Sequence, residues 1–201
     1  MSALTESTLL AVVFLLYFTA AFVWPTLRVW RLSGKNPYVL PSSDDVYGFV
    51  TKGMRIVMVS LVAYVLLQAV HPDLGRYTGE IAWLSRPALR SIGWILLAMA
   101  LLWTVGAQYQ MGLSWRIGID MQHRTALVTS GLFAVSRNPI FLAMRLSLLG
   151  MMLIRPNAVT VAIWLVGDVL MQFQVRLEEA YLLQRHGSAY AVYSARVRRW
   201  I

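Results

Sequence analysis

The stretch PIFLAMRLSLLGMMLIRPNAVTVAIWLVGDVLMQF, residues 139–173, holds two apolar runs on either side of the tripeptide Arg-Pro-Asn. Proline cannot continue an α-helix, and it also moves the preceding residue out of the helical region. The sequence therefore predicts two helices, Pro139–Ile154 and Ala158–Phe173, that form a tight hairpin with its turn near Pro156. Both runs approach the ~20 apolar residues that a helix needs to cross a bilayer, so we expect the hairpin to be embedded in a membrane.

The composition of the whole chain supports a membrane location. Apolar residues make up 58% of the 201 positions and charged residues only 13%, whereas soluble domains are about 25% charged. Three more apolar segments precede the hairpin, at about Ser7–Leu27, Met54–Val70 and Leu89–Gly106. The sequence therefore predicts an all-α, polytopic integral membrane protein with about five transmembrane helices.

The residue types also exclude several functions. The net charge is +9, but the basic residues stand at the ends of apolar runs, which fits anionic lipid headgroups better than a nucleic acid. The absence of cysteine excludes disulfides and thiolate chemistry. The three histidines lack the spacing of metal ligands, so we expect no metal site.

The distribution of lysine and arginine predicts the orientation in the membrane. With five spans and a cytoplasmic C-terminus, 13 basic residues fall inside and four outside. The positive-inside rule therefore places the N-terminus outside and the C-terminus in the cytoplasm. We expect the bacterial cytoplasmic membrane as the location.

Arg145 and Asp168 are charges inside the predicted hairpin. They stand eleven residues before and twelve residues after Pro156, so both lie about 17 Å from the turn. Isolated charges in hydrocarbon are costly and usually pair. We expect an ion pair that fixes the register of the hairpin; the alternative, that one of the two lines a substrate pocket, stays open.

Polar residues gather where the hairpin leaves the membrane. One helix begins at the proline of SRNP (136–139), and the other continues through Arg176 and the pair Glu178 and Glu179 to Gly187. A cytoplasmic amphipathic segment, SAYAVYSARVRRW (188–200), follows. Taken singly, these features suit a helix cap, a solvated face and interfacial aromatics. Together they suit a site that holds a charged, adenine-containing cofactor beside a lipid-like substrate.

The order of four motifs carries a family resemblance, namely LVTSGLFAVSRNP (127–139), EE (178–179), HGSAY (186–190) and VYSARV (192–197). From about Trp115 to Trp200 the chain resembles the membrane-embedded isoprenylcysteine carboxyl methyltransferase family, which also includes phospholipid N-methyltransferase-like proteins. The resemblance implies that S-adenosyl-L-methionine binds to the C-terminal region, residues 111–201. Three transmembrane helices, in residues 1–110, precede this region in the chain. It also implies a lipophilic acceptor that enters from the bilayer, such as an isoprenoid or prenyl carboxylate or a lipid amine.

The resemblance also implies a set of site residues. The cofactor-binding residues would be Leu127, Val128, Gly131, Phe133, Arg137, Asn138, Pro139, Glu178, Glu179, Tyr190 and Tyr193. We expect Arg176 and Glu179 to be catalytic, with Glu179 as a candidate base if the acceptor must lose a proton. The family usually has histidine where this chain has Asn138. Asparagine still forms hydrogen bonds but does not titrate near neutral pH, so only proton transfer by an imidazole is excluded at this position.

Two other functions stay open on the sequence alone. The first is an NADPH-dependent membrane reductase of the sterol type, because such enzymes have a similar hairpin and glutamate pair. The second is a non-enzymatic transport or scaffold protein in which Arg145 and Asp168 form a coupling site. The sequence specifies neither the acceptor group, whether carboxylate, amine or thiol, nor a prenylated-protein substrate, nor the oligomeric state.

Overall fold

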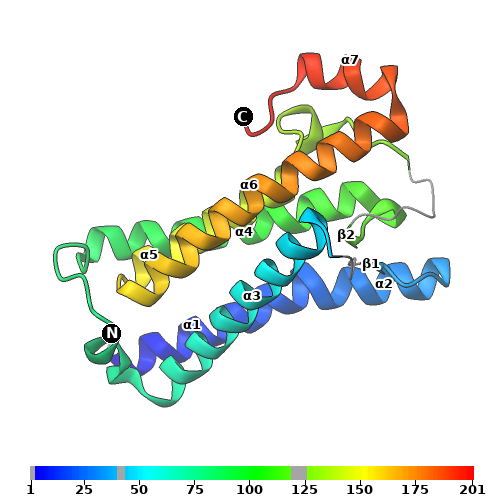
Figure 1. Ribbon diagram of the computed structural model, residues 1–201. Helices are drawn as coiled ribbons and strands as arrows, with labels where there is room; N and C mark the ends of the chain where they lie inside the picture. The colour runs from blue at the N-terminus through cyan, green and yellow to red at the C-terminus, as the bar shows by residue number, and fades with distance from the viewer. Residues whose placement is uncertain (1–2, 40–43, 119–125) are drawn as a thin grey trace.

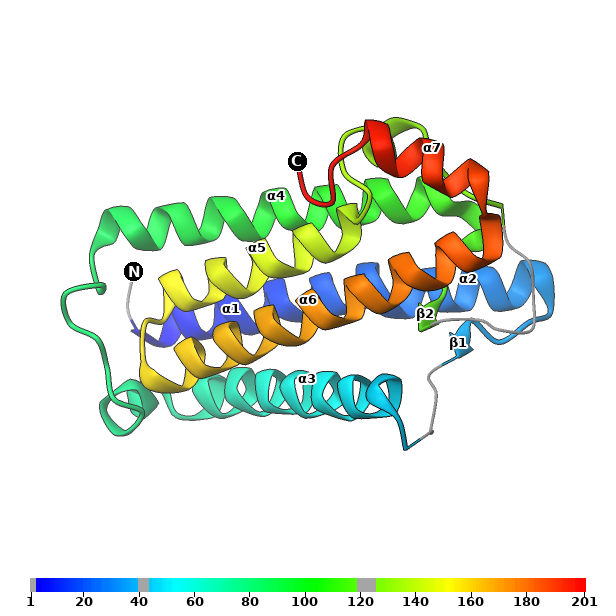
Figure 2. The ribbon, with the colours of Figure 1, turned by 45° about the horizontal axis from the view of Figure 1, so that its top comes forward.

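The computed structural model describes residues 3–39, 44–118 and 126–201, and α-helices dominate this part of the chain. The helices are α1 (Ala3–Phe18), α2 (Trp24–Ser33), α3 (Val46–Val70), α4 (Pro87–Met111), α5 (Pro139–Ile154), α6 (Ala158–His186) and α7 (Ser188–Arg196). Two short strands, β1 (Tyr38–Val39) and β2 (Ile117–Gly118), pair in parallel. In Figures 1 and 2, α1 and α3 to α6 run side by side along one long axis, and α7 folds back across one end.

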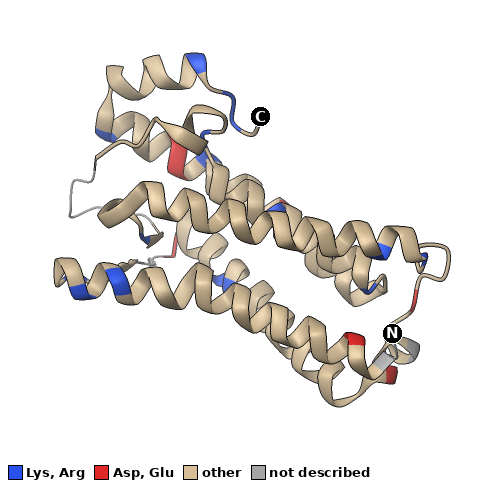
Figure 3. Cartoon of the chain, turned by 180° about the vertical axis from the view of Figure 1, so that it is seen from behind, with Lys and Arg blue, Asp and Glu red and all other residues tan. Residues whose placement is uncertain are grey.

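Within the described residues, four helices are long and apolar enough to cross a membrane, and α5 is a shorter apolar helix. The first of the four is continuous from Leu4 to Ser33, because a π-helical turn, η1 (Thr19–Val23), joins α1 to α2. The prediction of an all-α integral membrane protein is confirmed. The charged residues gather toward the two ends of the bundle and leave its middle largely uncharged (Figure 3).

The hairpin of α5 and α6 has the predicted bounds at its turn. Asn157 caps α6, since its side-chain oxygen accepts hydrogen bonds from the backbone nitrogens of Val159 and Thr160, each at 3.1 Å. Its amide nitrogen donates to the hydroxyl of Tyr64 on α3 at 2.7 Å. The turn is therefore fixed both within the hairpin and to a neighbouring helix. At its other end α6 continues past Phe173 to His186, and Gly187 follows with a φ of 55°.

The start of α3 differs from the prediction. The helix begins at Val46, eight residues before the expected Met54. Asp45 caps it by accepting a hydrogen bond from the backbone nitrogen of Gly48 at 2.8 Å. Lys52, which stands before the expected start at Met54, therefore belongs to the helix.

The predicted pair of Arg145 and Asp168 is present as an ion pair between α5 and α6. The guanidinium of Arg145 also lies over the ring of Trp200, with its carbon 4.4 Å from the ring centre. Arg145 therefore links the hairpin to the C-terminal tail as well as to its partner helix.

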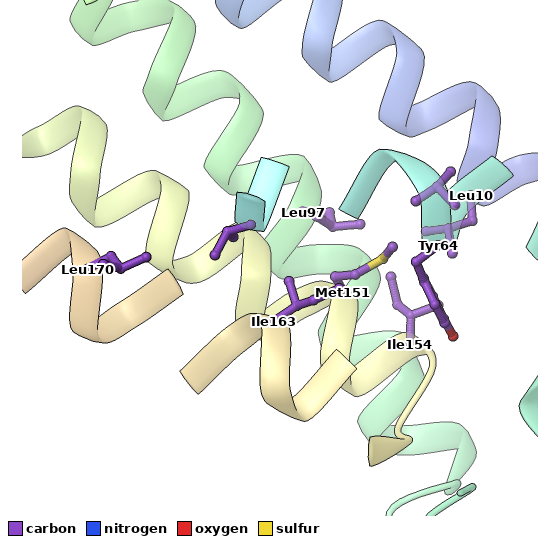
Figure 4. Close-up of a cluster of buried hydrophobic side chains, with 9 residues drawn as sticks. Leu10, Tyr64, Leu97, Met151, Ile154, Ile163 and Leu170 are labelled. Carbon is purple, nitrogen blue, oxygen red and sulfur yellow. The ribbon is translucent and has the colours of Figure 1, made fainter. Parts of the chain in front are cut away.

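The core lies between α1, α3, α4 and the hairpin. Leu10, Tyr64, Leu97, Met151 and Ile163 belong to its buried cluster (Figure 4). Beside this cluster α4 and α5 approach at Gly93 and Gly150. A side-chain carbon on Gly93 would lie 2.6 Å from the carbonyl oxygen of Gly150, so the two backbones pack directly on each other, as small residues allow in membrane helices.

The end of the bundle that carries the hairpin turn is held by a buried carboxylate. Glu6 of α1 is 4% exposed and pairs with Arg90 at 3.2 Å and with Arg155 at 3.5 Å. Arg155 also donates to the hydroxyl of Ser7 at 2.9 Å. We name this cluster of Glu6, Ser7, Arg90, Arg155 and Asn157 the paired end.

Candidate functional site

The opposite end of the bundle holds a cavity of about 620 Å³. Its walls come from the α1–η1–α2 helix, α3, α4, α5, α6 and α7, and from the segments on both sides of residues 119–125. We name this region the cavity end. The polar and charged wall residues include Thr51, Arg55, Thr104, Gln108, Arg116, Arg137, Asn138, Gln174 and Glu178.

The N-terminal wall of the cavity depends on the π-helical turn. A π-helix bonds each carbonyl to the fifth residue onward and often marks a functional site. The carbonyl oxygen of Ala21, within η1, accepts a hydrogen bond from the side-chain nitrogen of Gln108 on α4 at 2.6 Å. One turn earlier, the hydroxyls of Tyr17 and Thr104 are 3.0 Å apart. These two contacts join the first helix to α4 within the cavity wall.

Glu179 is the centre of an ion-pair network beside the cavity. Arg137 donates to its two oxygens through Nε and Nη2, each at 3.1 Å. Arg199 donates to one of them through Nε at 3.0 Å and Nη2 at 2.8 Å. The side-chain nitrogen of Asn138 donates to the other at 2.8 Å. Both oxygens are thus occupied, and Glu179 holds the start of α5 against the C-terminal tail.

The C-terminal tail completes this network with its backbone. The backbone nitrogen of Arg137 donates to the carbonyl of Arg198 at 3.0 Å. Its Nη1 donates to the carbonyls of Ser194 at 2.7 Å and Val197 at 3.1 Å. The guanidinium of Arg137 is therefore fixed from three directions.

Asn138 occupies the N-cap position of α5, as expected from its place before Pro139, but its side chain forms no capping hydrogen bond. The amide instead donates to Glu179 and, at 3.3 Å, to the carbonyl of Arg199. The residue that stands where the resembling family usually has histidine therefore acts here as a hydrogen-bond donor to a carboxylate.

Glu178 precedes Glu179 but has a different environment. Consecutive helical residues are about 100° apart around the axis, so one side chain can enter the network while its neighbour faces the cavity. Glu178 lines the cavity and lies within the electrostatic influence of Arg116. Among the described wall residues, Glu178 is the one carboxylate.

Tyr190 and Tyr193 cover the network from α7. The hydroxyl of Tyr193 donates to the carbonyl of Phe133 at 2.6 Å, and the two tyrosine rings meet edge to face with centres 5.9 Å apart. Burial raises the pKa of Tyr193 to about 12 and raises that of Tyr190 as well. Both hydroxyls therefore stay protonated at neutral pH. The buried hydroxyl of Tyr190 has no hydrogen-bond partner within the described part of the chain.

Gly131 shapes the loop that precedes α5. Its φ is 63°, in the left-handed region that favours glycine. A side-chain carbon at this position would lie 2.5 Å from the side chain of Gln110, whose oxygen accepts a hydrogen bond from the backbone nitrogen of Leu132 at 2.8 Å. A larger residue would therefore displace the loop that carries Phe133.

The structure brings most of the expected site residues to one place. The cavity wall contains Leu127, Val128, Phe133, Arg137, Asn138, Pro139, Glu178 and Tyr193. Gly131, Glu179 and Tyr190 are not among its wall residues but contact the side chains or the loop that form the wall. Arg176 is exposed and donates to Gln172 on its own helix, so no contact among the described residues supports its expected catalytic role.

Sequence reasoning missed the part of the wall that the N-terminal half provides. Tyr17, Phe22, Met54 and Arg55 line the same cavity as the C-terminal motifs. An apolar run predicts a spanning helix but does not indicate which of its faces meets a cavity. The polar residues Thr51, Thr104 and Gln108 within the apolar helices were the signal available, because membrane helices rarely direct such groups to lipid.

The fold and the site define an integral membrane helical bundle with one cavity that both polar and apolar side chains line. Comparison with protein-family models then identifies phospholipid methyltransferase over residues 89–189, half of the chain. The chain belongs to this family, which makes it a membrane methyltransferase that acts on a lipid-like substrate. The comparison with curated proteins found no match.

The family match confirms the resemblance drawn from the motifs but differs from it in extent. It begins near the start of α4 and ends just before Tyr190. It therefore includes Arg137, Asn138, Glu178 and Glu179, and it leaves out Tyr193, Arg199 and the whole wall formed by α1 to α3.

Proposed function

We propose that this protein transfers a methyl group from S-adenosylmethionine to a lipophilic acceptor at the cytoplasmic face of the membrane. One observation carries the proposal, the single cavity that joins a charged and aromatic region to apolar side chains of the bundle. Its volume of about 620 Å³ lies within the range of roughly 300–1,000 Å³ that is typical of small-molecule sites. In the proposed orientation, with the N-terminus outside, the cavity end faces the cytoplasm.

The wall residues fit the chemical groups of S-adenosylmethionine. A carboxylate such as that of Glu178 suits a positively charged sulfur or amino group. The rings of Trp115, Phe133 and Tyr193 line the cavity and suit an adenine ring or the face-on approach of a cation. When bound, S-adenosylmethionine supplies a methyl group on a positively charged sulfur that needs no further activation.

The two adjacent glutamates are proposed to have different roles. Glu179 is engaged by Arg137, Asn138 and Arg199 and positions the start of α5. Glu178 faces the cavity and is the better candidate for contact with the cofactor. Rigid placement of the wall in this way favours a displacement reaction, in which orientation of the two reactants supplies much of the rate.

The need for a base depends on the acceptor. A carboxylate acceptor attacks without losing a proton, whereas an amine must be deprotonated. In the second case Glu178, which lines the cavity, is our proposed acceptor of the proton. The expected base, Glu179, would first have to release one of its arginine partners.

The family match favours methyl transfer over the NADPH-dependent reductase and the transport protein. Titration of the purified full-length protein with adenosylhomocysteine and with NADPH tests this choice. We expect adenosylhomocysteine to bind with a Kd in the micromolar range, about −8 kcal/mol, and NADPH not to bind. If adenosylhomocysteine fails to bind, the proposal is wrong.

Variants assign the site within that experiment. Glu178→Gln should weaken adenosylhomocysteine binding about tenfold, because a charge-assisted contact is lost. Asp44→Asn is the matched control, since Asp44 is an exposed acid that forms no part of the cavity wall. Arg176→Gln tests the expected catalytic role of Arg176 directly, because turnover should fall only if this exposed side chain reaches the reactants. Mass spectrometry of lipid extracts incubated with labelled S-adenosylmethionine would identify the acceptor.

A further inference from the structure

Arg55 is a charged residue that the proposed cofactor site does not use. It lies nine residues into α3, about 14 Å along the helix axis. Its exposed side chain lines the cavity. Within the residues that the structure describes, it has neither an ion-pair nor a hydrogen-bond partner, whereas Arg137 and Arg145 are each paired with a carboxylate.

An unpaired guanidinium in an apolar helix needs an explanation, because charges within membrane helices are costly and usually mark a site. Lys52 provides the comparison on the same helix. It stands one turn earlier, lies 3.9 Å from the solvent-exposed Asp44 and is not among the cavity wall residues. Lys52 thus pairs with Asp44 in contact with solvent, whereas Arg55 faces the cavity.

The space beside Arg55 is apolar. Its neighbour Met54 lines the cavity together with Phe18, Phe22, Met58 and Met144, and the same five residues also line a second, smaller cavity of about 80 Å³ deeper in the bundle. The remaining walls of the smaller cavity are almost entirely aliphatic or aromatic. Methionine side chains adapt to irregular apolar ligands, so this space suits a flexible hydrocarbon chain.

Arg55 also lies outside the residues that match the family, which begin at residue 89. We infer that Arg55 binds an anionic oxygen group, a phosphate or a carboxylate, of the amphiphilic acceptor, whose hydrocarbon chain lies in the methionine-lined space beside it. A guanidinium suits both groups because it can donate two parallel hydrogen bonds to their oxygens. The inference rests on the proposed methyltransferase function, because it places the acceptor and the cofactor in the same cavity.

The geometry limits the acceptor further. Arg55 is on α3 and Glu178 is on α6, and both line one cavity. The acceptor would therefore place its anionic group on the wall that the N-terminal half provides. The cofactor would occupy the wall built by the C-terminal motifs.

Equilibrium binding of radiolabelled amphiphiles to the full-length protein in dodecyl maltoside micelles tests the inference. The probes are hexadecyl phosphate, hexadecanoate and uncharged hexadecanol, which have the same type of hydrocarbon chain and differ in the polar headgroup. We expect at least one anionic probe to bind about tenfold more tightly than hexadecanol, because it gains charge-assisted hydrogen bonds. The tighter of the two anionic probes distinguishes a phosphate-bearing acceptor from a carboxylate.

The variants are Arg55→Gln, Arg55→Lys and the matched control Lys52→Gln. Arg55→Gln should reduce the affinity for the anionic probe to that for hexadecanol, and Arg55→Lys should retain part of the preference. Lys52→Gln should change neither. Equal binding of all three probes to the wild-type protein would overturn the inference, and so would equal effects of Arg55→Gln and Lys52→Gln. If Arg55→Gln does not fold, the comparison of the three headgroups on the wild-type protein still tests the inference.

Adenosylhomocysteine binding separates this inference from the proposed function. Arg55→Gln should leave the affinity for adenosylhomocysteine unchanged, and a loss of that affinity would assign Arg55 to the cofactor and overturn the inference. If the wild-type protein prefers an anionic probe but does not bind adenosylhomocysteine, the amphiphile site stands and the methyltransferase proposal fails. If it binds adenosylhomocysteine without preferring an anionic probe, only the inference about Arg55 fails.

Discussion

The paired end and the cavity end of the bundle both carry arginines and buried carboxylates, but they use them differently. At the paired end, both oxygens of Glu6 are engaged, by Arg90 and Arg155. At the cavity end, Glu179 is equally engaged, yet Glu178 and Arg55 face open space in the same cavity. Satisfied charges thus fix the helices at both ends, while the charges that face the cavity distinguish the end proposed to bind ligands.

The variant Glu6→Gln should have the largest effect. It leaves Arg90 and Arg155 without their carboxylate, so we expect a loss of about 3 kcal/mol in the free energy of unfolding. Thermal unfolding followed by tryptophan fluorescence would measure the loss. Glu80→Gln, which changes an exposed acid at the same end, should have little effect. Adenosylhomocysteine affinity should not change below the unfolding temperature, and a parallel loss of affinity would show that the two ends do not act separately.

Glu179→Gln tests whether a stabilising carboxylate also positions the site. Removal of the charge weakens four hydrogen bonds from Arg137 and Arg199, so we expect a loss of about 2 kcal/mol in stability. Adenosylhomocysteine binding should also weaken, because the start of α5 is no longer held. Glu178→Gln should weaken binding without the loss of stability. Identical behaviour of the two variants would contradict the separate roles assigned to these neighbours.

The pair of Arg145 and Asp168 lies between the two ends and is partly exposed. Arg145→Leu alone should cost about 1–2 kcal/mol, because Asp168 then lacks its partner and Trp200 loses its cation. The double variant Arg145→Leu/Asp168→Leu should recover part of that loss, as a double-mutant cycle of unfolding free energies would show. If the double variant is no more stable than Arg145→Leu alone, this would argue against a pair that only fixes the register of the hairpin.

Tyr193→Phe should have the smallest effect. It removes one buried hydrogen bond to the carbonyl of Phe133 and should cost about 1 kcal/mol. The effect should depend on pH. The pKa of Tyr193 is raised from 10.0 to about 12 in the folded protein, so the folded state holds its proton more tightly than the unfolded state. The stabilisation is complete below pH 10 and is lost as the pH rises toward 12.

Unfolding measured from pH 9 to pH 12 would test this direction. The wild-type protein should lose stability across the range, and Tyr193→Phe should lose less. The difference between their free energies of unfolding should therefore narrow. A difference that widens with pH would show that the ionised hydroxyl is favoured in the folded state, contrary to the expected sign.

Particular residues decided how much the sequence could predict. Pro139 and Pro156 mark the helix start and the turn of the hairpin, because proline acts locally, so the bounds of α5 and the start of α6 were predicted correctly. The family motifs located the C-terminal wall for a similar reason, since they are short and ordered. Gly187 likewise marked the end of α6.

The remaining features depend on contacts between distant segments. Lys52 stands before the expected segment Met54–Val70, yet it lies within α3, where Asp45 supplies the cap. The two-residue pairing of β1 with β2 joins segments almost 80 positions apart in the chain, and no local pattern predicts it. The sequence also gives no indication that Glu178 would face the cavity while Glu179 is fully paired.

The π-helical turn at Thr19–Val23 has a consequence for helix register. One extra residue within a turn rotates the preceding part of the helix about its axis by about 100°, relative to an uninterrupted α-helix. Glu6 and Leu10, which pack at the paired end and in the core, therefore lie on one side of a rotational offset, and Thr26 and Leu27 at the cavity lie on the other. A single membrane span thus presents two differently phased faces, one for each end of the bundle.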